Sequence, residues 1–213
     1  MHKTKVWYNE QLLKQVSTSL TSKYYDVKVA KTKQEALNHI FKLIPNEAIV
    51  GVGGSITINE LGIKDQLRRR GNKLIDPFEP GIDKETSIKL RLDANRADYF
   101  LSSANAITKE GLIVNIDGSG NRVASTIFGP GHVIFVIGAN KITPDLDSAL
   151  YRAHNYVAVT NAKRLNMATP CVKSGECSDC RVADRICCIT VILERAPRRT
   201  PTTVVLVNEE LGL

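Results

Sequence analysis

The sequence predicts a single α/β domain with a cysteine-rich loop near its C-terminus. Helix-like and strand-like segments alternate along 213 residues without a repeat or an evident linker. Two apolar runs, at 112–116 and 132–137, are typical of strands that are buried on both faces. Glycine-rich turns follow two of the expected strands, at 51–55 and 117–122. With 43% hydrophobic and 24% charged residues, the chain has enough apolar side chains for a full core and is neither disordered nor collagen-like.

The first part of the chain reads as helix, strand, helix. Val6, Leu13 and Leu20 are spaced to share one face, which predicts an N-terminal helix over about 4–22. A short strand follows at 25–30. Next comes a Thr-Lys-Gln-Glu capping box at 32–35, which opens a second helix that ends near the proline at position 45.

The next segment is a strand, a glycine turn and a helix. The strand at 48–52 runs into the turn, and the Thr-Ile-Asn-Glu sequence at 57–60 is a second capping box that predicts a helix start. This helix should end near 68–71, because arginines suit the negative end of the helix dipole and a glycine permits the stop.

The remainder alternates in the same way. A brief strand at 73–75 precedes a helix at 83–96, and a short helix is expected after the second glycine turn. Thr143 as a cap and Pro144 at the first helical position predict a helix over 144–155. The expected strands of this part, in chain order, lie at 98–102, 112–116, 132–137, 189–193 and 203–207, and the short helix lies at 123–128.

Net charge and the absence of long apolar segments indicate which partners and which location to expect. The net charge of +7 suits an anionic partner, either a small metabolite or a nucleic acid. Nucleic acid is the weaker alternative, because no aromatic residues interleave the arginine clusters at 68–70 and 198–199. The N-terminus has no apolar signal segment, and no apolar run is long enough to span a membrane. We therefore expect a cytoplasmic protein without a membrane partner.

The cysteines form the sharpest motif. Four thiols at a C-x5-C-x2-C-x6-C spacing fall within one short segment, so a compact loop can aim all four at one centre. A [4Fe–4S] cluster is favoured, because structural zinc usually takes two separate close pairs and only one is present. Zinc and unligated thiols remain the alternatives. The adjacent Cys188 is expected in the core. The expected ligands are Cys171, Cys177, Cys180 and Cys187.

The two glycine turns are candidates for binding a small anion. Each follows an expected strand and precedes an expected helix, so backbone N–H groups could face one crevice at the carboxyl ends of the strands. Arg122 would then contact a carboxylate or phosphate. A purely conformational role for the glycines is the alternative. The candidate residues are Gly51, Gly53, Gly54 and Ser55 of the first turn, and Asp117, Gly118, Ser119, Gly120, Asn121 and Arg122 of the second.

No catalytic residue stands out. The chain has no complete dinucleotide-binding fingerprint, no P-loop lysine and no zinc-protease motif. Glu110, before a glycine, and Asp117 are weak candidates for a reacting carboxylate.

Together these motifs resemble the LUD-domain (lactate utilisation) family, in particular its short members with a C-terminal cysteine motif. The matching segments are 51–55, 60–62, 115–122, 128–130, 138–141, 161–165, 169–171, 177–180 and 185–187. The resemblance implies a fold like that of ribose-phosphate isomerases and CoA transferases, with one domain over 1–213. It also implies a link to oxidation of L-lactate to pyruvate alongside iron–sulfur partners.

Three functions fit these expectations. The first is an iron–sulfur redox or accessory component of hydroxy-acid utilisation, an oxidoreductase system, with redox protein partners and a small anionic ligand. The second is an acyl-CoA transferase or a sugar-phosphate isomerase-like enzyme with a structural cysteine loop. The third is a regulatory sensor whose cluster state controls partner binding. A homo-oligomer is compatible with each of them.

Overall fold

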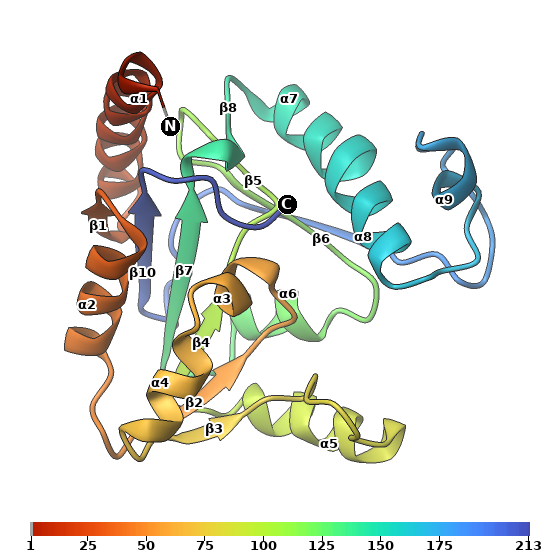
Figure 1. Ribbon diagram of the computed structural model, residues 1–213, viewed down its shortest axis with the longest axis horizontal. Coiled ribbons are helices and arrows are strands. Elements are labelled where there is room, and N and C mark those ends of the chain that lie inside the picture. Colours follow the sequence, from red (N-terminus) through yellow and green to blue (C-terminus); the bar gives the residue numbers. More distant parts are fainter. Residues whose placement is uncertain (1) are drawn as a thin grey trace.

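The computed structural model describes residues 2–213 as an α/β domain built around a six-stranded parallel sheet. This sheet has the strand order β1-β10-β7-β4-β2-β3, and all five pairings are parallel (Figure 1). The predicted α/β class is confirmed. In spatial order the strands are β1 (Asp26–Ala30), β10 (Thr202–Val207), β7 (His132–Gly138), β4 (Tyr99–Ser102), β2 (Ile49–Val52) and β3 (Lys73–Ile75).

A second sheet of four strands lies against one side of the first. Its order is β8-β5-β6-β9, with β6 antiparallel to both of its neighbours. Apolar side chains of β5, β6 and β9 share a buried cluster with α1 and with the central strands β10 and β7. These strands are β5 (Ala106–Thr108), β6 (Ile113–Asp117), β8 (Ile142–Thr143) and β9 (Ile189–Leu193).

Helices complete the layers. On one face of the parallel sheet, α2, α3 and α4 bury their apolar side chains, and on the other face α1 does so together with the second sheet. A third, smaller cluster joins α7 and the π-helical segment that follows it to β5 and β6. The helices are α1 (Lys3–Ser22), α2 (Lys33–Leu43), α3 (Ile56–Glu60), α4 (Ile63–Arg69), α5 (Lys84–Ala94), α6 (Asn121–Ile127), α7 (Leu146–Tyr151), α8 (Val159–Arg164) and α9 (Pro170–Ser174), with a 3₁₀ turn η1 (Ala139–Lys141) and a π-helical segment η2 (Arg152–Ala158).

The helix after the first glycine turn differs from the expectation. It begins at Ile56, because the Ser55 hydroxyl accepts the N–H of Ile58, and the 57–60 sequence is not its cap. It is also broken: α3 and α4 are separate helices, with Gly62 between them at a φ of 61°. The side chain of Thr57 is thereby free of a capping role and faces the interior.

The helix predicted over 144–155 begins two residues later and continues further. Asp145 is its cap and accepts the N–H of Ser148 at 2.8 Å, whereas Thr143 lies in β8 and Pro144 precedes the helix. After α7 the chain passes through η2 directly into α8. The prediction placed the cap at the wrong hydroxyl because both residue types cap helices well.

No helix within residues 2–213 combines the length and the apolar character that a membrane crossing requires.

Candidate functional site

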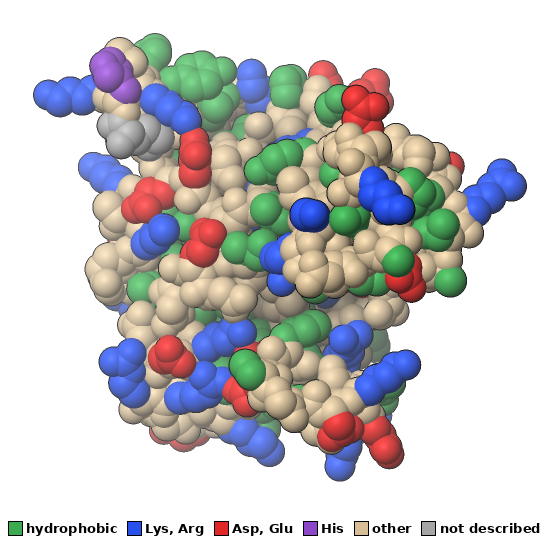
Figure 2. Space-filling view, turned by 45° about the vertical axis from the view of Figure 1, so that its right-hand side comes forward, with side chains coloured by type: hydrophobic (Ala, Val, Ile, Leu, Met, Phe, Trp, Pro, Cys, Tyr) green, Lys and Arg blue, Asp and Glu red, His purple; other side chains and the backbone are tan. Residues whose placement is uncertain are grey.

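A cavity of about 640 Å³ lies where the two predicted turns meet. Its walls come from the ends of β2, β4 and β6, from η1 and α6, and from η2 and α8 across the opening. Figure 2 shows Lys and Arg side chains on both sides of the furrow between the part that carries α7 to α9 and the part that carries α5. The charged side chains of the lining are Lys64, Arg91, Arg122, Lys141 and Arg164, against Glu79 and Asp117. The cavity is therefore suited to an anion.

The first turn forms one wall through Gly53, Gly54 and Ser55. A Cβ at Gly53 would lie 3.0 Å from Cγ of Arg122, so this glycine allows the second turn to pack against the first. Gly51 does not line the cavity, because it lies within β2, where a Cβ would meet the carbonyl oxygen of Ala94 at 2.9 Å. Gly51 therefore serves the packing of α5.

The second turn is shaped by its aspartate. The Asp117 carboxylate accepts the N–H groups of Ser119 at 3.1 Å and Gly120 at 2.9 Å. Gly118, Ser119, Asn121 and Arg122 line the cavity, whereas Gly120 takes a φ of 84° and starts α6. The expectation that both turns end parallel strands is wrong, since β6 is an antiparallel strand of the second sheet. The turns meet because the two sheets converge here.

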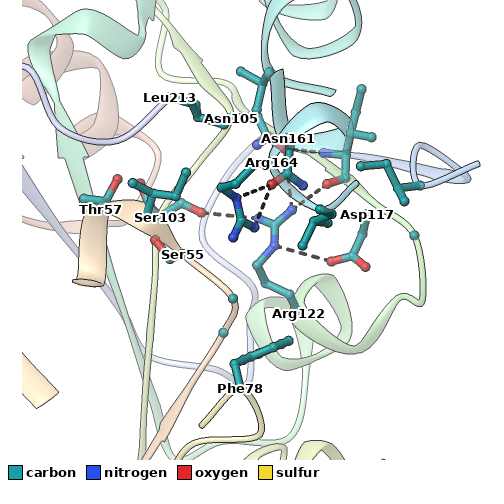
Figure 3. Close-up of a pocket in the computed structure, with 18 of the residues that line it drawn as sticks. Ser55, Thr57, Phe78, Ser103, Asn105, Asp117, Arg122, Asn161, Arg164 and Leu213 are labelled. Atoms are coloured by element: carbon teal, nitrogen blue, oxygen red, sulfur yellow. Dashed lines mark hydrogen bonds and ion pairs between the residues drawn. The ribbon is translucent and has the colours of Figure 1, made fainter. Parts of the chain in front are cut away.

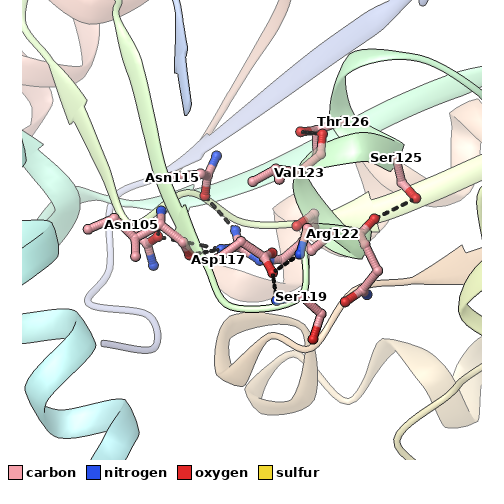
Figure 4. A network of polar contacts seen from close by, with 12 residues as sticks. Asn105, Asn115, Asp117, Ser119, Arg122, Val123, Ser125 and Thr126 are labelled. Atoms are coloured by element: carbon pink, nitrogen blue, oxygen red, sulfur yellow. Dashed lines mark hydrogen bonds and ion pairs between the residues drawn. The ribbon is translucent and has the colours of Figure 1, made fainter. Parts of the chain in front are cut away.

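Arg122 ties these elements together (Figure 4). Its guanidinium donates to the Asn115 side-chain oxygen and to the Ile116 carbonyl oxygen, each at 2.5 Å, and its Nε lies 3.4 Å from Asp117 Oδ2. Burial lowers the pKa of Arg122, and the Asp117 carboxylate opposes that shift. Much of its donor capacity is thus used within the protein, and a contact to a bound anion stays a prediction.

Lys141, which the sequence analysis did not single out, is the most unusual group of the cavity. Its side chain is 4% exposed, and its amine donates to the hydroxyl oxygens of Thr57 and Ser103, each at 2.9 Å. Burial, reinforced by the positive charges of Arg152 and Arg122, lowers its pKa to about 7. The available signal was a lysine three residues after Gly138, where the long apolar strand ends.

Figure 3 shows how the polar side chains of the opening are arranged. Ser55, Thr57 and Ser103 lie on one side of Arg122, and Asn161 and Arg164 of α8 lie above it. The Arg164 guanidinium is held by the side-chain oxygen of Asn161 at 2.8 Å. Polar groups from distant parts of the chain thus converge on one space.

The cysteine loop encloses a second, much smaller cavity. All four predicted cysteine ligands line it, together with His154 and Arg185. Each of the four cysteines is a free thiol. The Thr169 hydroxyl lies 3.2 Å from Cys171 Sγ. Arg185 donates to the carbonyl oxygens of Cys180 at 2.8 Å and Cys187 at 3.0 Å, which braces the loop. Burial raises the pKa of Cys187, although Arg185 opposes the shift.

Two further observations concern the cysteine loop as a metal site. Cys188 is exposed, so the expectation that it lies in the core is wrong; it follows the ligand segment at the start of β9, and its thiol donates to the Arg185 carbonyl oxygen at 3.2 Å. Among the residues that the structure describes, no three His, Cys, Asp or Glu side chains are grouped to hold a metal ion.

The two cavities adjoin. Ala158 and Ile186 line both of them and form a common wall between the thiol pocket and the larger space. Glu110 is exposed in the turn between β5 and β6 and is not among the lining residues, whereas Asp117 is.

These features define a class of protein: an α/β domain with a cationic cavity beside a four-thiol loop. The sequence matches the LUD domain over residues 13–207, and the chain belongs to the LUD-domain family.

Comparison with solved structures agrees with this assignment. The fold is similar to the crystal structure of a DUF162 family protein from Deinococcus radiodurans, with a TM-score of 0.52 and 16% sequence identity over 93% of this chain and 98% of that chain. A comparison with curated proteins gave no match.

Proposed function

We propose that this protein is a redox component of the utilisation of lactate or a related 2-hydroxy acid. It binds a small carboxylate in the larger cavity and holds a [4Fe–4S] cluster in the cysteine loop. Membership of the LUD-domain family supports the link to lactate. The observation that carries the proposal is the common wall of Ala158 and Ile186 between a cationic cavity and a pocket lined by four free thiols.

The residue types that line the thiol pocket match an iron–sulfur group, although the described side chains are not grouped to hold a metal ion as they stand. Four cysteine thiolates are the usual ligands of such clusters, and no other residue type is needed. Arg185 offsets their negative charge and holds two of the backbone carbonyls. A bound cluster supplies the transfer of single electrons. Oxidation of a 2-hydroxy acid to a 2-oxo acid releases two electrons and two protons, so a redox protein partner must accept the electrons in turn.

The protein itself binds the carboxylate. Lys64, Arg91, Arg122 and Arg164 line the cavity together with the two glycine turns, and the largely buried position of Arg122 strengthens its attraction for an anion. Asp117, hydrogen-bonded to its own turn and beside Arg122, fixes the shape of the wall rather than attacking a substrate.

Anaerobic purification with iron and sulfide analysis tests the proposal. We expect brown protein with a broad absorbance shoulder that is lost in Cys177→Ser. It should be retained in Cys188→Ser, the matched control, because Cys188 does not line the pocket. Lactate and pyruvate should then bind by calorimetry. Colourless protein that contains one zinc, or an absence of binding by both acids, would overturn the corresponding half of the proposal.

A further inference from the structure

We propose that Lys141 is a nucleophilic lysine whose side-chain amine forms an imine with the carbonyl carbon of an aldehyde or 2-oxo acid bound in the cavity. This inference rests on the proposed function for the location of the ligand and goes beyond it by assigning a covalent step and a carbonyl substrate. It stands on the hydrogen bonds around the amine.

Both neighbours of the amine are acceptors. The Ser103 hydroxyl donates its proton to the carbonyl oxygen of Val136 at 2.6 Å, and the Thr57 hydroxyl donates to that of Leu211 at 3.3 Å. Each hydroxyl therefore presents only lone pairs to Lys141, at 2.9 Å. Two acceptors match the two hydrogens of a neutral amine and leave its lone pair unused. An ammonium group would carry a third hydrogen.

The surrounding charges also favour the neutral form. Within residues 2–213 no carboxylate forms an ion pair with Lys141. The charged groups that act on it are Arg152 of η2, Arg122 of α6 and, with opposite effect, Glu60 of α3. The Glu60 carboxylate already accepts the N–H of Gly212 at 2.8 Å. A buried lysine without a carboxylate partner, under the influence of positive charges, is the setting in which an amine becomes a nucleophile near neutral pH.

The cavity lining suits the other end of the substrate. A 2-oxo acid carries a carboxylate next to its carbonyl group, so its negative charge is attracted by Arg122 of the lining while the carbonyl carbon meets Nζ. The lone pair adds to that carbon and forms the C–N bond. The carbonyl oxygen then leaves as water with the two amine hydrogens, which gives the C=N bond without any change of oxidation state.

Trapping with borohydride tests this step on the purified full chain. Protein is incubated with pyruvate or glyoxylate, reduced, digested and mapped by mass spectrometry. We expect the reduced adduct on the peptide that contains Lys141, and none with lactate, which has the same charge but no carbonyl group. Lys64 serves as an internal comparison, because it lines the same cavity but is paired with Asp76 at 2.7 Å.

The pH profile and two variants complete the test. Adduct formation at Lys141 should rise with pH through about 7. An amine of pKa 7 is about half neutral at pH 7, against roughly 0.03% for an ordinary lysine, a difference of about a thousandfold. Lys141→Met should abolish the adduct, and Lys89→Met, an exposed control, should not. The mapping on the unmodified protein remains decisive if Lys141→Met fails to fold.

The outcomes separate the two proposals. Pyruvate that binds by calorimetry but leaves Lys141 unlabelled overturns the imine step and leaves the proposed ligand site intact. Labelling spread over exposed lysines with a rise only above pH 9 also overturns it. Failure of both pyruvate and lactate to bind overturns the proposed ligand site as well.

Discussion

At the scale of single residues, two basic side chains of the cavity, Lys141 and Arg122, differ in their partners. Lys141 has only hydroxyl partners, whereas Arg122 is engaged by an amide, a main-chain carbonyl and a carboxylate. Removing a charged donor from such partners leaves them unpaired, which is more costly than the loss of the bond itself. Arg122 is thus expected to matter for stability before it matters for any ligand.

Replacement of Arg122 tests whether the residue contributes to stability more than to ligand binding. Arg122→Gln should lower the free energy of unfolding by about 1.5–3 kcal/mol, because Gln cannot reach the Ile116 carbonyl and Asp117 together. Urea denaturation measures the change, with Arg91→Gln at the cavity rim as the control. If stability is unchanged while affinity for lactate or pyruvate falls, the arginine acts mainly as a ligand contact.

At the scale of elements, the loop between α6 and β7 depends on one glycine. Gly129 has a φ of 131°, and a Cβ there would lie 2.4 Å from the Asn95 carbonyl oxygen. Gly129→Ala should therefore lower the free energy of unfolding by roughly 2–4 kcal/mol, through backbone strain and overpacking together.

The control for this prediction is Gly71→Ala. Gly71 has a φ of 87° but nothing within 4 Å of its missing Cβ, so only the strain of roughly 1–2 kcal/mol applies. Thermal or urea unfolding of both variants measures the difference. If both variants lose the same free energy of unfolding, the added methyl group of Gly129→Ala is accommodated beside Asn95 without cost.

The elements also show what could be read from the sequence. Periodicity and capping predicted the N-terminal helix, the parallel strands and the helix after Asp83 to within a few residues. These sequence patterns could not predict that β6, which ends at Asp117, is an antiparallel strand of a second sheet, because strand pairing depends on residues far away in the chain. Lys141 was missed for the same reason: its partners Thr57 and Ser103 lie 84 and 38 residues away.

At the scale of the whole molecule, stability is divided between the sheets and the cysteine loop. The four predicted cysteine ligands lie outside the three buried clusters, except that Cys187 packs against one of them. Metal or cluster binding is coupled to the folding of the loop that supplies its ligands. We expect that removing the bound group affects that loop far more than the central sheet.

Hydrogen exchange tests this division. Cys177→Ser, or chelation of the bound group, should speed amide exchange within about 165–195 and leave β7 and β10 protected. Cys188→Ser should leave both regions unchanged, since its thiol is exposed. Faster exchange confined to the sheet would contradict the coupling.

The strand order has a consequence for how the protein is made. β10 lies between β1 and β7, with Thr203 opposite both Asp26 and Ile134. During synthesis on the ribosome, the first strand therefore emerges well before the neighbour with which it pairs. Until β10 has been released, β1 has no partner strand and the β10-facing edge of β7 is unpaired. Open strand edges of this kind are surfaces that chaperones protect. Completion of the six-stranded sheet therefore waits for β10, which is synthesised after its other five strands.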